Sequence, residues 1–394
     1  MKNQIILSLL AISGLASCSD NSDDNYEEIP SYPFVEAEFG STVDLGNLAN
    51  YANQTVPAYI IKDNSQGNLI TDKGATLGRV LFYDKNLSSN NTISCASCHK
   101  QEFAFSDTNV ASTGVNGTTG RHSMRLINSR FASETKFFWN ERALNLETQT
   151  TMPIKDHGEM GFSGENGDLS FDDLITKLSA IGYYKELFKF VYGTEEITEA
   201  KIQSALAQFI RSIQSFDSKY DAGRALATND GQPFSNFTAQ ENQGKNLFLS
   251  PPVFNTNGVR TSGGLGCAGC HRAPEFDIDP NTLNNGIIGT IAGTGIDTGN
   301  TRAPSLRDLV RKDGTTNGPM MLTGVITTLQ AAIGHYGTIN LAPGNNNLDP
   351  RLTPGGVGQQ LNLTATEVNA VIAFLRTLSG TDVYTNTKWS NPFN

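Results

Sequence analysis

The chain has 394 residues, of which 38% are hydrophobic and 17% are charged, and it contains 38 glycines. This composition excludes a coiled coil or a wholly disordered chain and suits a loop-rich globular protein, and the length allows two core-forming domains. The 29 Lys and Arg residues are outnumbered by 39 Asp and Glu residues, which gives a net charge of -10. A chain of this charge repels a phosphate backbone, so we expect no nucleic acid among its partners.

The first residues have the order of a secretory signal: Lys2, an apolar run at 5–12, and small residues before Cys18. The apolar run is too short to span a bilayer. The sequence therefore predicts export, with residues 1–17 as the signal peptide. Leu-Ala-Ser before Cys18 resembles the lipobox of bacterial lipoproteins, which implies a lipid anchor at Cys18. The alternative is an ordinary signal that leaves Cys18 as a free thiol.

Residues 18–40 are expected to form the lipid anchor and an acidic tether. Ser19 to Glu36 are polar and acidic, a composition that buries too little apolar surface to fold. Such tethers resemble the surface-export signals of Bacteroidetes lipoproteins. We expect a membrane-anchored lipoprotein, and its periplasmic and cell-surface locations both stay open.

The other four cysteines form two C-x-x-C-H motifs, Cys95-Ala96-Ser97-Cys98-His99 and Cys267-Ala268-Gly269-Cys270-His271. In this motif the two thiols attach to the vinyl groups of one porphyrin, and the His that follows ligates its iron. A zinc or thioredoxin-like site would leave both His residues unexplained. The sequence therefore predicts two covalently bound haem c groups, with His99 and His271 as iron ligands.

The residues around the two motifs repeat as well. Gly78-Arg-Val-Leu81-Phe82 precedes the first motif and Gly244-Lys-Asn-Leu247-Phe248 precedes the second, which indicates a duplicated unit. Capping boxes at Thr238 and Thr364 predict that a helix begins at each. Apolar periodicity predicts further helices at about 171–192 and 198–219.

This pattern predicts a mostly α fold with two cytochrome c-like domains, each wrapped around one haem. The domains are expected at 41–230 and 231–394, with long loops at 251–266 and 340–358, where Gly and Pro recur.

The segment after the first motif carries a family resemblance. It reads Gly120-Arg121-His122-Ser123, Phe137-Phe138-Trp139-Asn140-Glu141-Arg142-Ala143, Leu146-Glu147-Thr148-Gln149, Pro153 and Glu159-Met160-Gly161. From about residue 70 to 380 the chain resembles the bacterial di-haem cytochrome c peroxidase and MauG family. The resemblance implies that Trp139 lies between the haems and that Gln149 and Glu159 border a peroxide pocket.

The chemistry of these side chains agrees with those roles. A carboxylate such as Glu159 can take a proton from one peroxide oxygen and return it to the other. Gln149 can orient peroxide by hydrogen bonds but cannot shuttle protons. Trp139 offers an easily oxidised site between two metals. His157 can influence the protonation of Glu159 or serve as a loop histidine with a structural hydrogen bond.

The first haem is expected to keep an open position. Family members with a distal His on this haem carry it in a loop after the motif, and residues 101–120 contain no His. We therefore expect a five-coordinate or water-bound iron on His99. His122 is the alternative ligand.

For the second haem the resemblance places the protein ligand at Tyr336, as in MauG. A phenolate stabilises ferric iron relative to a thioether, so this iron should accept electrons poorly. His335 is the nearest competitor, followed by Met320 or Met321. The family also holds a calcium ion, for which the carbonyl positions are Asn317 and Pro319. His122 replaces the family's Asn ligand, which argues against calcium because calcium prefers oxygen ligands.

The sequence predicts a di-haem peroxidase that reduces hydrogen peroxide with electrons from a small redox protein or a protein substrate. Two alternatives stay open: a MauG-like, peroxide-dependent oxidase of protein side chains, and a di-haem electron carrier without peroxidase activity. Family members often dimerise, so the resemblance also allows a homodimer.

Overall fold

The computed structural model describes residues 31–278 and 280–393, so Cys18 and the predicted signal peptide lie outside the described residues. The helices are α1 (Pro33–Phe39), α2 (Asp72–Tyr83), α3 (Cys95–Cys98), α4 (Leu146–Thr151), α5 (Phe171–Ser179), α6 (Gly182–Tyr192), α7 (Glu199–Ser212), α8 (Lys219–Arg224), α9 (Ala239–Leu249), α10 (Leu329–Gly337) and α11 (Ala365–Arg376). Among the described residues, no helix is long and apolar enough to span a membrane.

The strands form three small antiparallel hairpins: β1 (Thr113–Gly114) with β2 (Gly117–Thr118), β3 (Pro252–Phe254) with β4 (Arg260–Gly263), and β5 (His271–Arg272) with β6 (Asp277–Ile278). Between β6 and α10 the described residues form neither a helix nor a named strand. Regular structure is therefore mainly helical, with long irregular stretches, as the sequence predicts.

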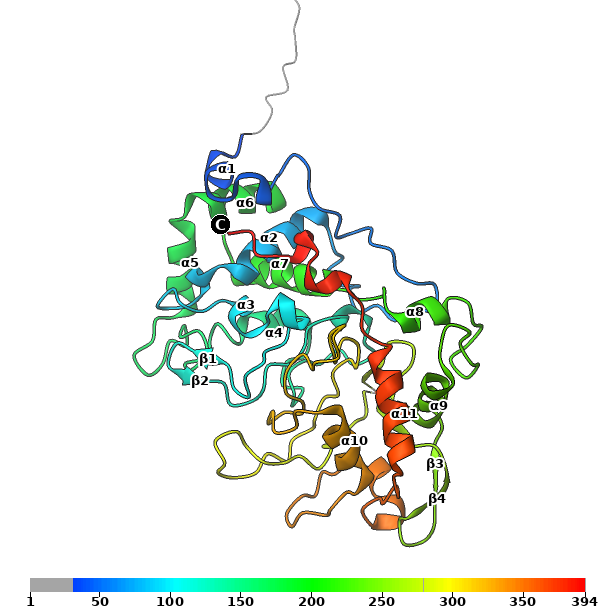
Figure 1. The fold of residues 1–394 in the computed structure, drawn as a ribbon. Helices are drawn as coiled ribbons and strands as arrows, with labels where there is room; N and C mark the ends of the chain where they lie inside the picture. The colour runs from blue at the N-terminus through cyan, green and yellow to red at the C-terminus, as the bar shows by residue number, and fades with distance from the viewer. Residues whose placement is uncertain (1–30, 279, 394) are drawn as a thin grey trace, which may run out of the picture. The chain divides into compact units, whose positions relative to one another are not determined.

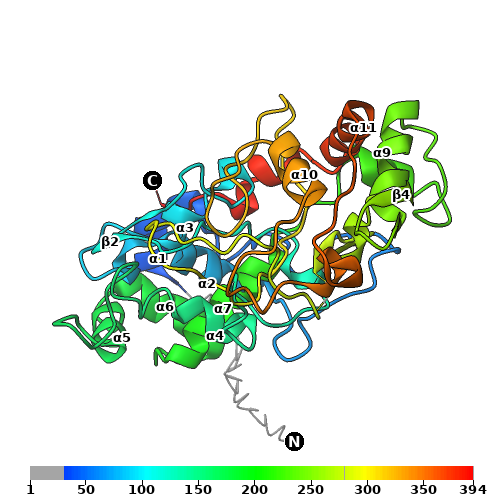
Figure 2. The same cartoon turned by 90° about the horizontal axis from the view of Figure 1, so that it is seen from below.

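Two helix pairs repeat within the fold. Helix α2 packs against α7, and α9 packs against α11, as both views show (Figures 1 and 2). Gly78 of α2 and Gly244 of α9 occupy matching places in the two pairs. A Cβ atom at Gly78 would collide with the carbonyl oxygen of Ala205, and one at Gly244 with that of Ala370. The repeated sequence therefore marks a helix contact that is too close for a side chain.

The two capping boxes begin helices as predicted. Thr238 caps α9 and Thr364 caps α11, and in each case the Glu three residues later completes the box. A further box, Ser218 with Asp221, begins α8 and was missed in the sequence.

The sequence predicts one helix at 171–192, but the structure has two separate helices there, α5 and α6. Ile181 between them has an extended backbone, with φ -91° and ψ 123°. The predicted helix at 198–219 also ends early, at Ser212, because Ile213 is extended with ψ 102°. Both breaks come at a β-branched residue, which a helix accommodates less readily than a strand or loop.

Two other boundaries need correction. The tether predicted for residues 18–40 ends before Pro33, because Val35 and Phe39 of α1 lie four residues apart on one face and are both buried. The loop predicted at 251–266 contains the β3–β4 hairpin, whose turn closes at Gly258 with a φ of 72°. The loop at 340–358 holds only short 3-10 turns, Pro350–Leu352 and Pro354–Gly356.

Apolar side chains gather in two cores. The first holds buried residues between Val35 and Ile213, and the second holds buried residues between Tyr220 and Leu378. Val383 and Trp389, near the C-terminus, return to the first core. The predicted domain boundary between 230 and 231 is not tested by these cores and stays a prediction.

A buried ion pair lies where the chain passes between the cores. Nη1 of Arg307 donates to Oδ2 of Asp221 at 2.8 Å, and Nη2 donates to the carbonyl oxygen of Pro274 at 2.9 Å. The guanidinium group also stacks 5.0 Å from the ring of Phe216 and 5.4 Å from that of Tyr220. Arg307 is completely buried, so its removal would leave the Asp221 carboxylate without its cation.

We therefore expect Arg307→Ala to lower the free energy of unfolding by about 3–5 kcal/mol. Urea unfolding of the haem-loaded protein measures this change. Lys219→Ala is the control, because the Lys219–Glu241 pair is much more exposed and should contribute at most about 1 kcal/mol. Equal effects of the two variants would contradict this account of the junction.

Candidate functional site

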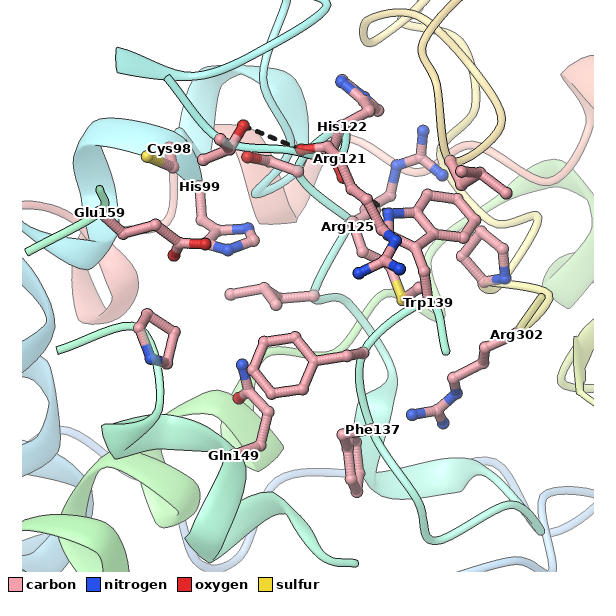
Figure 3. Close-up of a pocket in the computed structure, with 18 of the residues that line it drawn as sticks. Cys98, His99, Arg121, His122, Arg125, Phe137, Trp139, Gln149, Glu159 and Arg302 are labelled. Carbon is pink, nitrogen blue, oxygen red and sulfur yellow. Dashed lines mark hydrogen bonds between the residues drawn. The ribbon is translucent and has the colours of Figure 1, made fainter. Parts of the chain in front are cut away.

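The first cavity brings together the residues predicted for the peroxide site. It has a volume of about 590 Å³, and Cys95, Cys98 and His99 of the first motif lie in its wall. The wall also contains Trp139, Gln149 and Glu159. Figure 3 shows the Glu159 carboxyl group, the His99 ring and the Gln149 amide turned toward this space.

A second cavity of about 610 Å³ contains the second motif. Cys267, Cys270 and His271 lie in its wall together with Tyr336. Both volumes suit a large, mostly apolar ligand. Each predicted haem motif therefore opens onto a cavity of its own.

The two cavities share a wall. Residues 122–125 and 302–304 line both cavities, and so does Trp139. Nε1 of Trp139 donates to the carbonyl oxygen of His122 at 2.7 Å, and the backbone N–H of Arg302 donates to the carbonyl oxygen of Trp139 at 2.7 Å. The indole is thus held between the cavities, where the family resemblance expects it.

The two motif histidines have the protonation state that iron ligation requires. Burial lowers the pKa of His99 to about 4 and that of His271 to about 4, so both rings are neutral near pH 7. Nδ1 of His99 lies 3.3 Å from the carbonyl oxygen of Phe105, to which it donates. Nε2 of His99 therefore carries a lone pair that is available to a metal.

Arg125 provides an independent sign of an anionic ligand. This arginine lines both cavities, and its Nε is buried without a hydrogen-bond partner. A buried guanidinium group needs an acceptor, and the propionate carboxylates of a haem would supply one. With the paired cysteines and the neutral histidines, the residues of both cavities fit covalently bound haem.

Sequence reasoning did not single out the basic lining of the first cavity, to which Arg121, Arg125, Arg142 and Arg302 contribute. Arg121 pairs with Asp297, and Arg142 lies over the ring of Phe138 at 3.5 Å. Arg121 and Arg142 belong to the stretches that carry the resemblance. Arg125 and Arg302 come from irregular segments, where no periodicity indicates which way a side chain points.

The backbone around Glu159 is tightly held. Oδ1 of Asp156 accepts from the N–H groups of Gly158 at 2.9 Å and of Glu159 at 3.0 Å. On the other side, the N–H of Val115 donates to the carbonyl oxygen of Glu159 at 3.0 Å, and that of Asn116 to Gly158 at 3.2 Å. The turn between β1 and β2 thus locks the segment that presents the carboxyl group.

The pKa of Glu159 is raised to about 7, chiefly by burial and also by the nearby Asp156 carboxylate, while Arg142 opposes the shift. Among the described residues, no side chain or backbone group forms a hydrogen bond or salt bridge with this carboxyl group. A carboxyl group with a pKa near neutrality can both accept and donate a proton.

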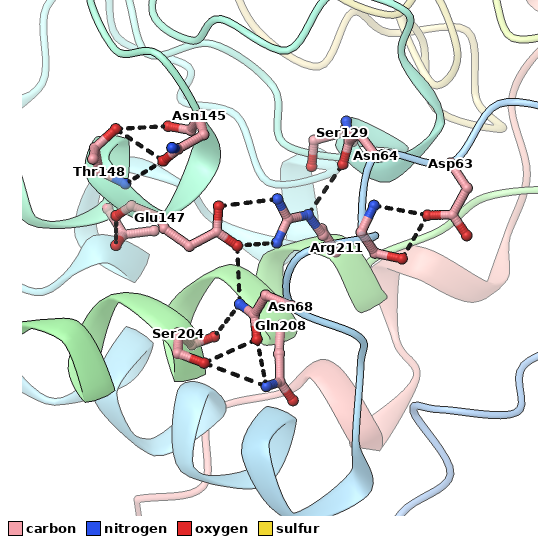
Figure 4. Close-up of polar contacts among 12 residues, drawn as sticks. Asp63, Asn64, Asn68, Ser129, Asn145, Glu147, Thr148, Ser204, Gln208 and Arg211 are labelled. Atoms are coloured by element: carbon pink, nitrogen blue, oxygen red, sulfur yellow. Dashed lines mark hydrogen bonds and ion pairs between the residues drawn. The ribbon is translucent and has the colours of Figure 1, made fainter.

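Helix α4 presents Gln149, and an ion pair on another face of the helix holds it in place. Glu147 of α4 pairs with Arg211 of α7, where Nη2 donates to Oε2 at 3.1 Å and Nη1 donates to Oε1 (Figure 4). Asn68 Nδ2 also donates to Glu147 at 2.9 Å. The Gln149 amide has no hydrogen-bond partner in the described part of the chain, so it is free to bind a ligand.

The sequence leaves two histidines with more than one possible role, His157 and His122, and the structure bears differently on each. Nδ1 of His157 lies 2.8 Å from Oδ2 of Asp168, and the exposed ring is not part of the first cavity's lining, which favours a structural hydrogen bond. His122 lines both cavities, with Nδ1 donating to the carbonyl oxygen of Asn109 at 3.0 Å. Its Nε2 is buried without a partner, so ligation by His122 stays an alternative.

At the second cavity the geometry favours Tyr336 over His335. Tyr336 lines the cavity, and Nδ2 of Asn285 donates to its Oη at 3.1 Å. Burial raises the pKa of Tyr336 above its usual value. His335 is not among the lining residues, whereas Met320 and Met321 are. No contact tests ligation itself, so Tyr336 stays a prediction.

The predicted calcium positions are the carbonyl groups of Asn317 and Pro319, and the contacts of the Asn317 side chain do not involve its backbone carbonyl group. Oδ1 of Asn317 accepts from Nε of Arg311 at 3.2 Å, and Nδ2 of Asn317 donates to the carbonyl oxygen of Asp308 at 2.8 Å. Pro319 lines the second cavity. Within the described residues, no group of three or more His, Cys, Asp or Glu side chains is placed to hold a metal ion, so calcium stays a prediction.

We expect Glu147→Leu to destabilise the protein by about 1–3 kcal/mol, because it leaves the buried Arg211 without its carboxylate. Glu147→Gln keeps an acceptor but no charge and should lose less. Urea unfolding measures both changes, and the Michaelis constant for peroxide should rise with them because α4 carries Gln149. Wild-type stability in Glu147→Leu would show that the ion pair does not hold this helix.

The amino-acid sequence is similar to those of known haem proteins. A sequence model described as di-haem cytochrome c peroxidase matches residues 72–229. The methylamine utilization protein MauG of Methylorubrum extorquens is 29% identical over 282 residues, which are 69% of this chain and 70% of that protein. Cytochrome c551 peroxidase of Nitrosomonas europaea is 27% identical over 321 residues, 78% of this chain and 80% of that protein.

The fold has a solved counterpart too. The crystal structure of a MauG-like protein associated with microbial copper homeostasis matches with a TM-score of 0.65 and 28% identity, covering 86% of this chain and 99% of the other. Residues 72–229 thus match the di-haem cytochrome c peroxidase family, and over most of its length the chain, with its two haem motifs and paired cavities, is similar to cytochrome c peroxidases and MauG proteins.

Proposed function

We propose that the protein reduces hydrogen peroxide in the first cavity. The observation that carries this proposal is the half-buried carboxyl group of Glu159, which faces the same cavity as His99 and has no hydrogen-bond partner in the described structure. A haem held by Cys95, Cys98 and His99 would supply the iron that binds peroxide and accepts its oxidising equivalents. The overall reaction consumes hydrogen peroxide, two protons and two electrons and yields two water molecules.

Glu159 moves the proton that cleavage of the oxygen–oxygen bond requires. Its ionised form takes the proton from one oxygen of peroxide, and its protonated form returns that proton to the other oxygen, which leaves as water. A carboxyl group whose pKa is about 7 serves both steps with little bias. Gln149 orients peroxide through its free amide, and Trp139 lies where an electron can pass between the cavities.

The electrons come from a small redox protein or from a residue of a protein substrate. Two cytochrome c-like halves, one around each cavity, would divide this work, with Tyr336 as the ligand in the second. Tyr336 also favours the second candidate, a MauG-like oxidase of protein side chains, because a phenolate ligand stabilises oxidised iron. The raised pKa of Glu159 argues against a pure electron carrier, because electron transfer alone does not need a proton shuttle in the cavity.

Replacement of Glu159 tests the proposal. Glu159→Gln removes the proton shuttle and should slow the reaction of the haem-loaded protein with peroxide about 100- to 10,000-fold. The wild-type rate should rise as pH rises through about 7, because only the ionised carboxylate accepts the first proton. Stopped-flow mixing across pH 5–9 measures both effects, and the variant should lack this rise.

Glu165→Gln is the matched control, because Glu165 is an exposed carboxylate six residues further along the same segment. It should keep the wild-type rate and pH profile. A Glu159→Gln variant that reacted at the wild-type rate would mean that another group moves the proton. A protein whose spectrum did not respond to peroxide at all would be an electron carrier.

We also propose that the protein is an exported lipoprotein, anchored through Cys18 on the periplasmic side or at the cell surface. The signal-like residues 1–17 and the lipobox-like sequence before Cys18 support this location. Calcium between the halves and a homodimer remain predictions from the family resemblance.

Cys18→Ala should move the protein from the membrane fraction to the soluble fraction and abolish labelling by a radioactive fatty acid. Cell fractionation and labelling measure the two effects. If the variant remained in the membrane fraction with its label, the anchor would lie elsewhere.

A further inference from the structure

The side chain and carbonyl group of Asn285 contact three residues that compete for the ligand position in the second cavity. Nδ2 of Asn285 donates to Oη of Tyr336 at 3.1 Å and to Sδ of Met321 at 3.3 Å. The backbone carbonyl oxygen of Asn285 accepts from Nε2 of His335 at 2.9 Å. One residue therefore holds an oxygen, a sulfur and a nitrogen candidate at once.

The orientation of the Asn285 amide follows from its own backbone contacts. Its Oδ1 accepts from the N–H of Ile287 at 3.1 Å, and only an oxygen can accept there, so the amide nitrogen must face Tyr336 and Met321. The preceding residue, Asn284, is fully buried and exchanges two hydrogen bonds with Asn345, at 2.7 and 3.0 Å. The segment is thus held rigidly.

The three contacts of Asn285 affect the three candidate ligands differently. Tyr336, Met321 and Asn285 line the second cavity, and His335 does not. Because Nε2 of His335 gives its hydrogen to the Asn285 carbonyl, that nitrogen has no lone pair to offer a metal. The ring keeps a lone pair only on Nδ1, and its bond to the Asn285 carbonyl holds it outside the cavity lining. The phenol and the thioether, which share the Asn285 amide, remain as the candidates in the cavity.

Met321 is held in an unusual conformation beside this amide. Its φ of 69° lies in the left-handed region, which non-glycine residues seldom adopt. Two turn contacts maintain it: the N–H of Met320 donates to the carbonyl oxygen of Ile326 at 2.6 Å, and that of Gly324 to Met321 at 3.1 Å. These contacts fix where the sulfur lies, next to the amide that also reaches Tyr336.

A hydrogen bond from an amide affects the two remaining candidates differently. It stabilises negative charge on a phenolate oxygen and so reduces the charge which that oxygen donates to a metal. A neutral thioether is a weak acceptor and gains little from the same bond. An amide donor at this place therefore favours the oxygen ligand and also tunes it.

We propose that Asn285 is a positioning residue that selects Tyr336 over Met321 and His335 as the ligand of the second haem, and that its hydrogen bond weakens electron donation by the phenolate. This inference rests on the proposed function in that it requires haem in the second cavity. It adds a residue 51 positions away from Tyr336 in the chain to the set that defines this iron site.

Asn285→Leu tests the proposal, because leucine is similar in size and donates no hydrogen bond. In the ferric protein with both haems, the phenolate-to-iron absorption band should move to longer wavelength, and the reduction potential of the second haem should fall. An unchanged band and an unchanged potential would overturn the proposal.

Met321→Leu is the matched control, because it removes the sulfur and keeps the bond between Asn285 and Tyr336. It should retain the wild-type band and potential, and a shift as large as that of Asn285→Leu would overturn the proposal. If Asn285→Leu instead loses the phenolate band and the reduction potential of the second haem rises, the double variant Asn285→Leu with Met321→Leu tests whether Met321 has replaced Tyr336. Recovery of the band in the double variant supports the selection of Tyr336 over Met321 by Asn285, and failure to recover it contradicts that selection.

The failure of this inference can be told apart from the failure of the proposed function. A wild-type protein without the phenolate band, but with peroxide reduction that depends on Glu159, would overturn only this inference. A protein with the predicted band and its shift in Asn285→Leu, but without reaction with peroxide, would overturn only the peroxidase.

Discussion

A half-buried carboxyl group, that of Glu159, without a hydrogen-bond partner in the described structure is the constraint on which the first cavity depends. Desolvation is the largest cause of the raised pKa of Glu159, and any strong hydrogen bond to the carboxylate would cancel much of it. The fold therefore has to hold the backbone of Glu159 firmly while leaving its side chain alone. The Asp156 side chain and the β1–β2 turn do this through hydrogen bonds to the main chain of Gly158 and Glu159.

The wall between the cavities serves both of them. The His122 carbonyl accepts from the Trp139 indole, and the Arg302 N–H donates to the Trp139 carbonyl, so both hydrogen bonds that hold this residue go to main-chain groups. Arg125 lies in the same wall with an unpaired Nε, so a carboxylate bound in either cavity would change the electrostatic environment of the other. The two sites are thus coupled through packing and charge as well as through an aromatic ring.

Much of this arrangement could be predicted because it is local in sequence. The two haem motifs, the repeated glycines of the helix contacts and the capping box at Thr364 each lie within a few residues of one another. Arg125 and Asn285 could not be predicted, because each acts through contacts with distant parts of the chain and lies in an irregular segment without periodicity. Helix α1 was missed because its few apolar residues follow an acidic stretch that dominates the local composition.

The central claim is that one haem iron, on His99, keeps an open coordination position beside Glu159. Low-temperature electron paramagnetic resonance of the ferric, haem-loaded protein tests it most directly, because high-spin and low-spin iron give separate signals. The account predicts a high-spin signal from the first haem, equivalent to one iron per chain, that changes when peroxide or a small anionic ligand is added. Two low-spin signals, with no high-spin iron and no response to added ligand, would contradict it.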